Sequence, residues 1–153
     1  MTWRATSSSR EEIAAAAMAQ VKYYKQRCGI TAFLRAGSGR IFVPAGIVGA
    51  IVAPAAQAAT LVRRLPLVVP AIVHRQVGRR TTWTLLTAPV PDHLRRSART
   101  REVLDRCGAG LVDEGDEIAL PSPGDPALRW HGGAPTDRYR PSPVSILTAM
   151  HGR

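Results

Sequence analysis

The pattern of apolar and polar positions divides the chain into short segments that are typical of strands and helices. Gly46–Val52 is an apolar, β-branched run without a charge, which is typical of a strand buried on both faces of a sheet. Pro54 follows at a position that the first turn of a helix tolerates. The helical pattern over 54–65 has Arg63 and Arg64 in its last turn, where cations favour the helix dipole. This stretch predicts a strand followed directly by a helix.

Two pairs of apolar runs predict antiparallel hairpins. Runs 30–35 and 40–43 flank a Gly-Ser-Gly turn, where glycine supplies the backbone freedom that a tight connection needs. Runs 68–74 and 81–87 flank the basic connection Arg75–Arg80. After residues 108–112 and a turn at 113–116, a strand-like run is predicted at 117–120. The chain then becomes rich in Pro and Gly, interrupted by residues 127–131.

Three segments carry helix signals. Residues 9–27 begin with serine caps and place Glu11 and Glu12 in the first turn, and basic residues precede a glycine at the end. Asp92 is expected to cap a helix that runs to about Arg106. The inner face of that helix is predicted to carry Leu94, Ala98, Leu104 and Cys107. A short helix is expected over 142–150.

These elements predict a single α/β (α+β) domain over residues 1–153, with helices packed on a mixed sheet. We expect an amino-terminal helix over 9–27, a core over 30–147 and a tail over 148–153. No internal repeat or long linker interrupts the chain.

One uncharged segment suggests a membrane span as an alternative. Ile41–Val62 is 22 residues long, which is enough to cross a bilayer. Pro44 and Pro54 would break a helix there, so we expect no membrane association. The chain starts without the apolar run of a secretory signal. Cys28 and Cys107 lie far apart and outside any metal-ligand spacing, which favours free thiols and a cytoplasmic location.

Charge makes a polyanionic partner plausible. Lys and Arg total 21 against 11 Asp and Glu, giving +10. Residues 1–40 carry +5, residues 41–101 carry +8, residues 102–128 carry −6 and residues 129–153 carry +3. Nineteen of the basic residues are Arg, a bias that GC-rich codons also produce. The excess charge remains, and it indicates either binding to a polyanion or a solvated basic face.

The basic connection and the outer face of the predicted helix 92–106 hold the candidate binding residues. Guanidinium groups suit phosphate contacts, and Trp83 offers a ring for stacking on a base. The alternation over 81–87 also allows a core position for Trp83, with solvated arginines. Likewise, Arg129–His131 suits either an exposed reader of bases or a strand with its Trp turned inward. The candidate nucleic-acid-binding residues are Arg75, Arg79, Arg80, Trp83, Arg95, Arg96, Arg99 and Arg101.

No catalytic constellation is visible in the sequence, and we expect no metal site and no cofactor. Asp113–Glu117 gathers acids, but turns collect Asp and Gly for backbone reasons. Gly37–Gly39 is too short for a phosphate loop and fits a hairpin tip. Ser122 has no partner in the sequence with which to form a nucleophilic triad, because the histidines are scattered.

A family resemblance covers roughly Val48 to Leu147. The order of several weak motifs resembles the actinobacterial proteins grouped with bifunctional primase-polymerase amino-terminal domains. The segments that carry it are Val48–Ala55, Pro70–His74, Gly78–Arg80, Thr82–Leu86, Gly115–Pro123 and Arg129–Trp130.

The resemblance implies a primase-type core with two divalent metals on a paired-acid strand and a His on a later strand. Two metals that clamp a triphosphate need clustered carboxylates. The strand that would carry them reads Gly49–Pro54 and contains no acid, and Thr81–Trp83 stands where the family motif places its His. Both catalytic signatures are absent, which indicates a degenerate active site.

The sequence therefore predicts a non-catalytic nucleic-acid-binding or replication-associated accessory domain, which contacts DNA or RNA electrostatically. The alternative is a regulatory module whose basic face docks an acidic protein. A residual nucleotidyltransferase has the least support, because it needs metal chemistry without the carboxylate pair.

Overall fold

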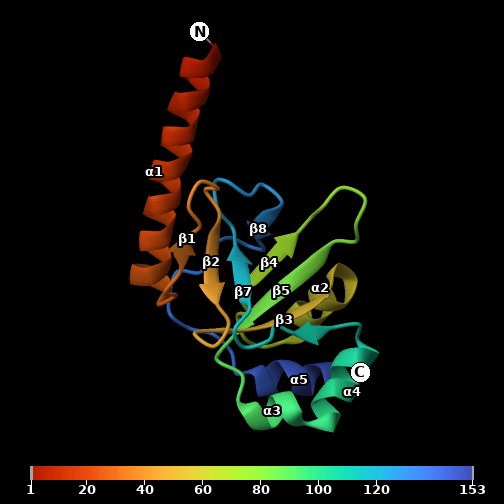
Figure 1. Ribbon diagram of the computed structural model, residues 1–153. Helices are drawn as coiled ribbons and strands as arrows, with labels where there is room; N and C mark the ends of the chain where they lie inside the picture. Colours follow the sequence, from red (N-terminus) through yellow and green to blue (C-terminus); the bar gives the residue numbers. More distant parts are fainter. Residues whose placement is uncertain (1, 153) are drawn as a thin grey trace.

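The computed structural model describes residues 2–152, and their side chains from Ser9 onward (Figure 1). The helices of the described chain are α1 (Thr2–Cys28), α2 (Ala55–Arg64), α3 (Asp92–Arg96), α4 (Ala98–Arg106) and α5 (Pro143–His151). Its strands are β1 (Phe33–Leu34), β2 (Ile41–Pro44), β3 (Gly49–Pro54), β4 (Ala71–His74), β5 (Thr82–Thr87), β6 (Gly110–Leu111), β7 (Glu117–Leu120) and β8 (Leu128–Trp130).

The strands form two sheets, a three-stranded one in the order β1-β2-β7 and a five-stranded one in the order β6-β3-β5-β4-β8. The predicted α+β class is confirmed, whereas the prediction of a mixed sheet is wrong, because every paired strand is antiparallel to its neighbour. The β3–α2–β4 connection does leave β3 and β4 parallel to each other. However, β5 lies between them and is antiparallel to both, as in a split β-α-β unit.

The strand followed directly by a helix is confirmed, but the strand starts at Gly49, and Gly46 and Ile47 of the predicted run lie in the turn before it. Gly49, Ala50 and Ile51 are buried in β3, which has a paired strand on each side. Pro54 ends this strand and caps α2 without a side-chain hydrogen bond. Both predicted hairpins are present, as the antiparallel pairs β1–β2 and β4–β5.

The single helix predicted over 92–106 is divided into two. Ser97 has an extended backbone (φ −67°, ψ 124°), and its hydroxyl accepts a hydrogen bond from the Thr100 amide, so it caps α4. Three of the four predicted inner-face residues contact a hydrophobic core: Leu104 is buried, and Leu94 and Cys107 are half-buried against it. Ala98 is exposed, and Val103 is buried in addition.

The helix predicted over 142–150 is confirmed as α5, whereas the amino-terminal helix is longer than predicted. Helix α1 starts at Thr2 instead of Ser9, so Glu11 and Glu12 lie in its middle and not in its first turn. Most of the predicted tail belongs to α5, whose Met150 is buried. Figure 1 shows α1 projecting beyond the sheets at its amino-terminal end, and its packed residues lie toward its carboxyl end.

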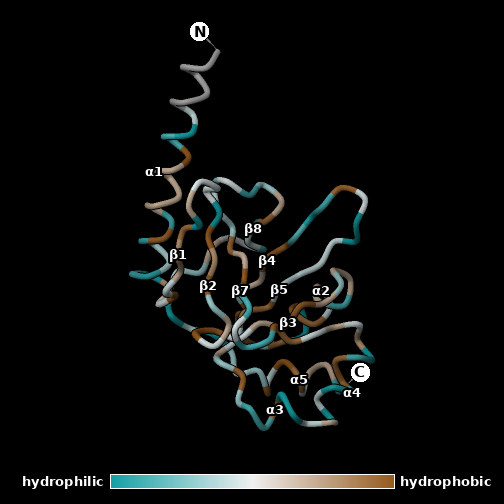
Figure 2. Tube along the Cα trace, viewed as in Figure 1, coloured by the Kyte–Doolittle hydropathy of each residue, from teal (hydrophilic) through white to brown (hydrophobic). Residues whose placement is uncertain are grey.

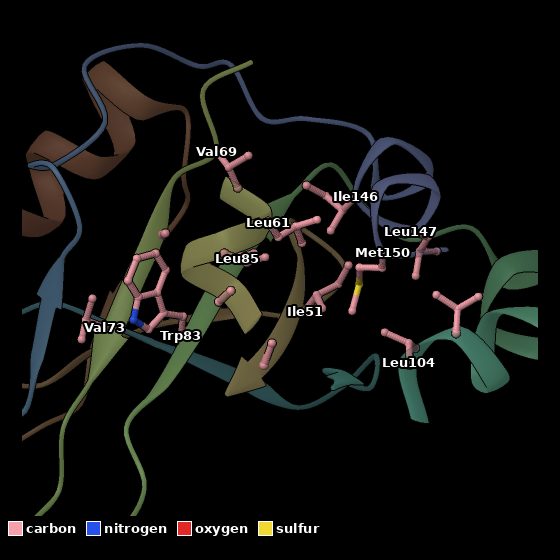
Figure 3. Close-up of a cluster of buried hydrophobic side chains, with 14 residues drawn as sticks. Ile51, Leu61, Val69, Val73, Trp83, Leu85, Leu104, Ile146, Leu147 and Met150 are labelled. Atoms are coloured by element: carbon pink, nitrogen blue, oxygen red, sulfur yellow. The ribbon is translucent and has the colours of Figure 1, made fainter. Parts of the chain in front are cut away.

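Two hydrophobic cores lie on opposite faces of the five-stranded sheet, because successive residues of a strand point to opposite sides. The helix-side core lies between this sheet and α2, α4 and α5 (Figure 3). It contains Ile51, Ala53, Ala58, Leu61, Val69, Ala71, Val73, Trp83, Leu85, Val103, Leu104, Ile146, Leu147 and Met150. The sheet-side core lies between the two sheets and the end of α1, and contains Tyr24, Cys28, Ile30, Ile41, Val43, Ala45, Val48, Ala50, Ile72, Leu86, Ile118, Leu120 and Leu128.

The uncharged stretch from Ile41 to Val62 is distributed over β2, β3 and α2. None of the helices in the described part of the chain combines the length and the apolar character that a membrane crossing requires.

Candidate nucleic-acid interface

The β4–β5 hairpin holds the predicted basic connection away from the body of the protein (Figure 1). His74 pairs with Thr82 at its base, and the Arg79 amide donates to the Gln76 carbonyl across the turn at 3.2 Å. Gly78 is the third residue of this turn and has φ +76°. Glycine adopts a positive φ without strain, which other residues do not. The turn therefore projects its side chains into solvent.

All six residues of this loop, Arg75 to Arg80, are exposed. Figure 2 shows the loop as hydrophilic on both sides of a short hydrophobic tip. Val77, between the arginines, is fully exposed. The loop thus presents three guanidinium groups around one aliphatic side chain.

The register of the sheet brings residues of β8 beside the hairpin. Val73 lies opposite Trp83 on one side and opposite Arg129 on the other, so these three residues share the helix-side face. Arg75 directly follows β4 and His131 directly follows β8, and backbone hydrogen bonds continue the pairing at both. The Arg75 amide donates to the Ala127 carbonyl at 2.9 Å, and the His131 amide donates to the Ala71 carbonyl at 2.8 Å, so both side chains share the face of Val73 and Arg129.

These residues surround a cavity of about 370 Å³ at the base of the hairpin, which we call the cup. The cup is lined by Ala55, Ala56, Ala59, Val73, Arg75, Thr81, Trp83, Arg129 and His131. Three alanines of α2 form one wall, and the strands form the rest. Its lining has arginine and histidine side chains but no carboxylate.

The aromatic part of the cup is a tilted pair of rings. The ring centroids of Trp83 and His131 are 4.4 Å apart, and the ring planes are tilted by 36°. Trp83 is only 8% exposed and belongs to the helix-side core, so its ring is covered (Figure 3). His131 is exposed, and it is therefore the ring that a ligand would meet.

The arginines of the hairpin and of β8 form no ion pair with the side chains that the structure describes. Ion pairs within 4.0 Å are found for Arg35, Arg40 and Arg106, each with a carboxylate elsewhere. Because Arg75, Arg79, Arg80 and Arg129 lack such partners, their charge is available to an external anion.

The other predicted arginines lie at the far end of β5. This strand has six residues, so its ends are roughly 17 Å apart at about 3.3 Å per residue. The hairpin lies at the Thr82 end, and α3 and α4 follow the Thr87 end (Figure 1). The structure therefore does not place the helix arginines beside the hairpin, and the two groups form separate surfaces.

Two of the helix arginines are occupied by contacts within the fold. Arg95 is half-buried and donates to the Val112 carbonyl at 2.9 Å. Arg99 lies 3.1 Å from the His151 ring nitrogen. Arg96 and Arg101 are exposed. This surface is less free to bind an anion than the hairpin.

Arg129 and His131 were not among the predicted binding residues, although the sequence contains a signal for them. Leu128 and Trp130 pack toward the sheet-side core, and Trp130 donates to the Tyr24 hydroxyl. Strand alternation then turns Arg129 and His131 to the opposite face. The sequence alone does not show that β8 lies beside β4, and this pairing creates the cup.

The described residues contain no group of three or more His, Cys, Asp or Glu side chains that could hold a metal ion. Asp113 and Asp116 lie in an exposed turn that is closed by a hydrogen bond from the Asp116 amide to the Asp113 carbonyl. β3 carries no acidic residue.

A scan of protein-family models, a search of curated proteins and a search of solved structures each returned no match for this chain.

Proposed function

We propose that this protein is a non-catalytic nucleic-acid-binding or replication-associated accessory domain, with a degenerate primase-polymerase-like fold, that contacts phosphates through the β4–β5 hairpin. The observation that carries the proposal is the exposed cluster of Arg75, Arg79 and Arg80, which is extended by Arg129 and forms no ion pair with the side chains from Ser9 to Gly152.

Guanidinium groups on a projecting hairpin suit a phosphate backbone. Arginine presents several donors in a fixed fork and bonds two phosphate oxygens at once. Each phosphate that is neutralised releases counterions, so binding weakens as salt rises. Four arginines that each contact one phosphate predict a slope of about −3.6 for log K against log salt with duplex DNA.

The test reverses charge in the hairpin and, separately, in the distant helices. The variant Arg79→Glu/Arg80→Glu alters the hairpin tip, and Arg96→Glu/Arg101→Glu changes the net charge equally on exposed positions of α3 and α4. Binding to a fluorescent oligonucleotide is measured by anisotropy over a range of salt concentrations.

We expect the hairpin variant to lose about tenfold or more in affinity at low salt and to lower the salt slope by about two. The helix variant is expected to change affinity much less. Equal losses in both variants, or wild-type affinity that is independent of salt, would contradict the proposal. A native pull-down tests the alternative. Recovery of an acidic protein that binds the wild type after nuclease treatment, and does not bind the hairpin variant, favours a protein-docking module.

A further inference from the structure

The cup at the base of the hairpin combines two cations, an exposed aromatic ring and a small apolar wall in one cavity. We propose that it binds one unpaired nucleobase of a single strand, with the base stacked on His131 and the adjacent phosphate held by Arg75 and Arg129. This inference rests on the proposed function and deepens it, because it assigns a preference for unpaired over duplex nucleic acid.

His131 has the properties of a stacking platform. Its imidazole packs against the Trp83 ring at 4.4 Å between centroids and a tilt of 36°, and Trp83 is fixed in the helix-side core. The His131 side chain is nevertheless exposed, so it offers its free surface to the cup. A ring held in place by a buried neighbour loses little entropy on binding, and every nucleobase has a face that stacks on an aromatic ring.

The two arginines lie where one phosphate can reach both. Val73 lies opposite Arg129, and the Arg75 amide bonds to Ala127, so Arg75 and Arg129 are diagonal neighbours on adjacent strands. Such pairs have about 7–8 Å between them, which two long arginine side chains bridge. The first turn of α2 also lines the cup. Its N-cap, Pro54, has no side-chain oxygen, so this turn places no capping acceptor near a bound phosphate.

The shape of the cup selects an unpaired base. The alanines of α2 are small and leave a cavity of about 370 Å³, within the usual range of small-ligand sites. A base within a duplex is stacked on both sides and paired at its edge, so it cannot enter such a cavity. Sequence-tolerant readers of single strands use the same combination of aromatic platform and basic groove.

The experiment compares three probes of equal length by anisotropy at one salt concentration. They are a single-stranded oligothymidylate, a duplex, and a strand whose sugars carry no bases. The third probe keeps the phosphates and removes the stacking partner. Four forms of the full chain are compared: wild type, His131→Ala, Ala56→Phe and the control His93→Ala.

Ala56→Phe fills the cup from an exposed position of α2 without disturbing the core, and His93 is an exposed histidine on α3 outside the cup. We expect the wild type to prefer the single strand over the duplex and over the baseless strand. Both cup variants should lose about fivefold or more of their affinity for the single strand, and less than twofold for the duplex. His93→Ala should match the wild type.

The failure of this inference differs from the failure of the proposed function. In one outcome, the wild type binds the single strand and the baseless strand equally and in a salt-dependent way, with both cup variants unchanged. That result rejects base binding in the cup and leaves the proposed function standing. Wild-type protein that binds none of the three probes overturns both. Equal losses for the single strand and the duplex in His131→Ala show a phosphate contact only and also overturn the stacked base.

Discussion

The two faces of the five-stranded sheet are closed in different ways. The sheet-side core is covered by a second sheet and by the end of α1, and buried hydrogen bonds tie these parts together. The Tyr24 hydroxyl donates to the Pro121 carbonyl and accepts from Trp130 Nε1. The helix-side core is covered by separate helices and leaves the cup open at one edge. The contrast indicates that both faces carry a buried core, and that the helix-side face also leaves room for a ligand at one edge.

The open edge follows from the position of α2. This ten-residue helix packs on β3 and β5, whereas β8 lies at the edge of the sheet beyond β4. The side chain of Arg129 on β8 and that of His131 directly after it therefore remain exposed on the helix side of the sheet. On the sheet side of the same strand, Leu128 is buried and Trp130 packs against the sheet-side core.

The largest expected effects come from removing one leucine from each core. Leu85 and Leu86 are adjacent in β5, both fully buried, and they face the helix-side and the sheet-side core respectively. We expect Leu85→Ala and Leu86→Ala each to lower the free energy of unfolding by about 2–5 kcal/mol. Val68→Ala, at a position 77% exposed, is the control and should stay within about 0.5 kcal/mol. Denaturant unfolding measures all three variants. A small loss at only one of the two leucines would show that the core containing that leucine adds little stability.

A smaller effect is expected from the hydrogen bonds that are specific to the sheet side. Tyr24→Phe leaves the Trp130 Nε1 donor and the Pro121 carbonyl without their partner, so we expect a loss of about 1–3 kcal/mol in the free energy of unfolding. Tyr23→Phe removes a half-buried bond to the Pro135 carbonyl and should cost less. Equal losses in the two variants would contradict a special role for the buried network.

The sheet side should also weaken at alkaline pH. Burial raises the pKa of the Tyr24 phenol above its ordinary value of 10.0 and that of the Cys28 thiol above 9.0, against a smaller opposite effect of Arg140 on the thiol. Because the native state holds these protons more tightly, their contribution is complete below about pH 9. It is lost as pH rises through the unfolded and then the folded pKa. Unfolding curves at pH 8 and pH 10 test this, and Tyr24→Phe should show a shallower decline than the wild type.

The smallest effect on stability is expected at the open edge. The His131 side chain is exposed, and its ring packs on Trp83 at the edge of the core. We expect His131→Ala to change the free energy of unfolding by no more than about 0.5 kcal/mol. A loss comparable to that of Tyr24→Phe would show that the cup is part of the structural core and would remove the contrast between the two faces.

Local signals predicted most elements of this fold. The strand at Glu117–Leu120 has the predicted bounds, and β3 with α2 follows from an apolar run, a proline and a basic end. The division of the helix over 92–106 was missed, although Ser97 is a favoured capping residue inside that stretch. An isolated serine does not interrupt most helices, so the sequence pattern alone does not mark this break.

The candidate site was only partly predictable because its residues come from different parts of the sheet. Arg75, Arg79 and Arg80 form a local cluster that the sequence displays directly. Arg129 and His131 join the site through the pairing of β8 with β4, which depends on contacts distant in sequence. The hairpin is separated from Arg96 and Arg101 because β5 runs from the hairpin toward α3 and α4, a direction that the sequence alone does not show.

The separation in sequence of the strands that form the cup also implies an order of folding. The β4–β5 hairpin joins neighbours in sequence, so its loop closes at a low entropic cost, whereas β8 must return from the last quarter of the chain. We therefore expect the hairpin to form early and β8 to dock late. The basic tip would then exist in a partly folded chain, and the cup would be completed only when folding ends.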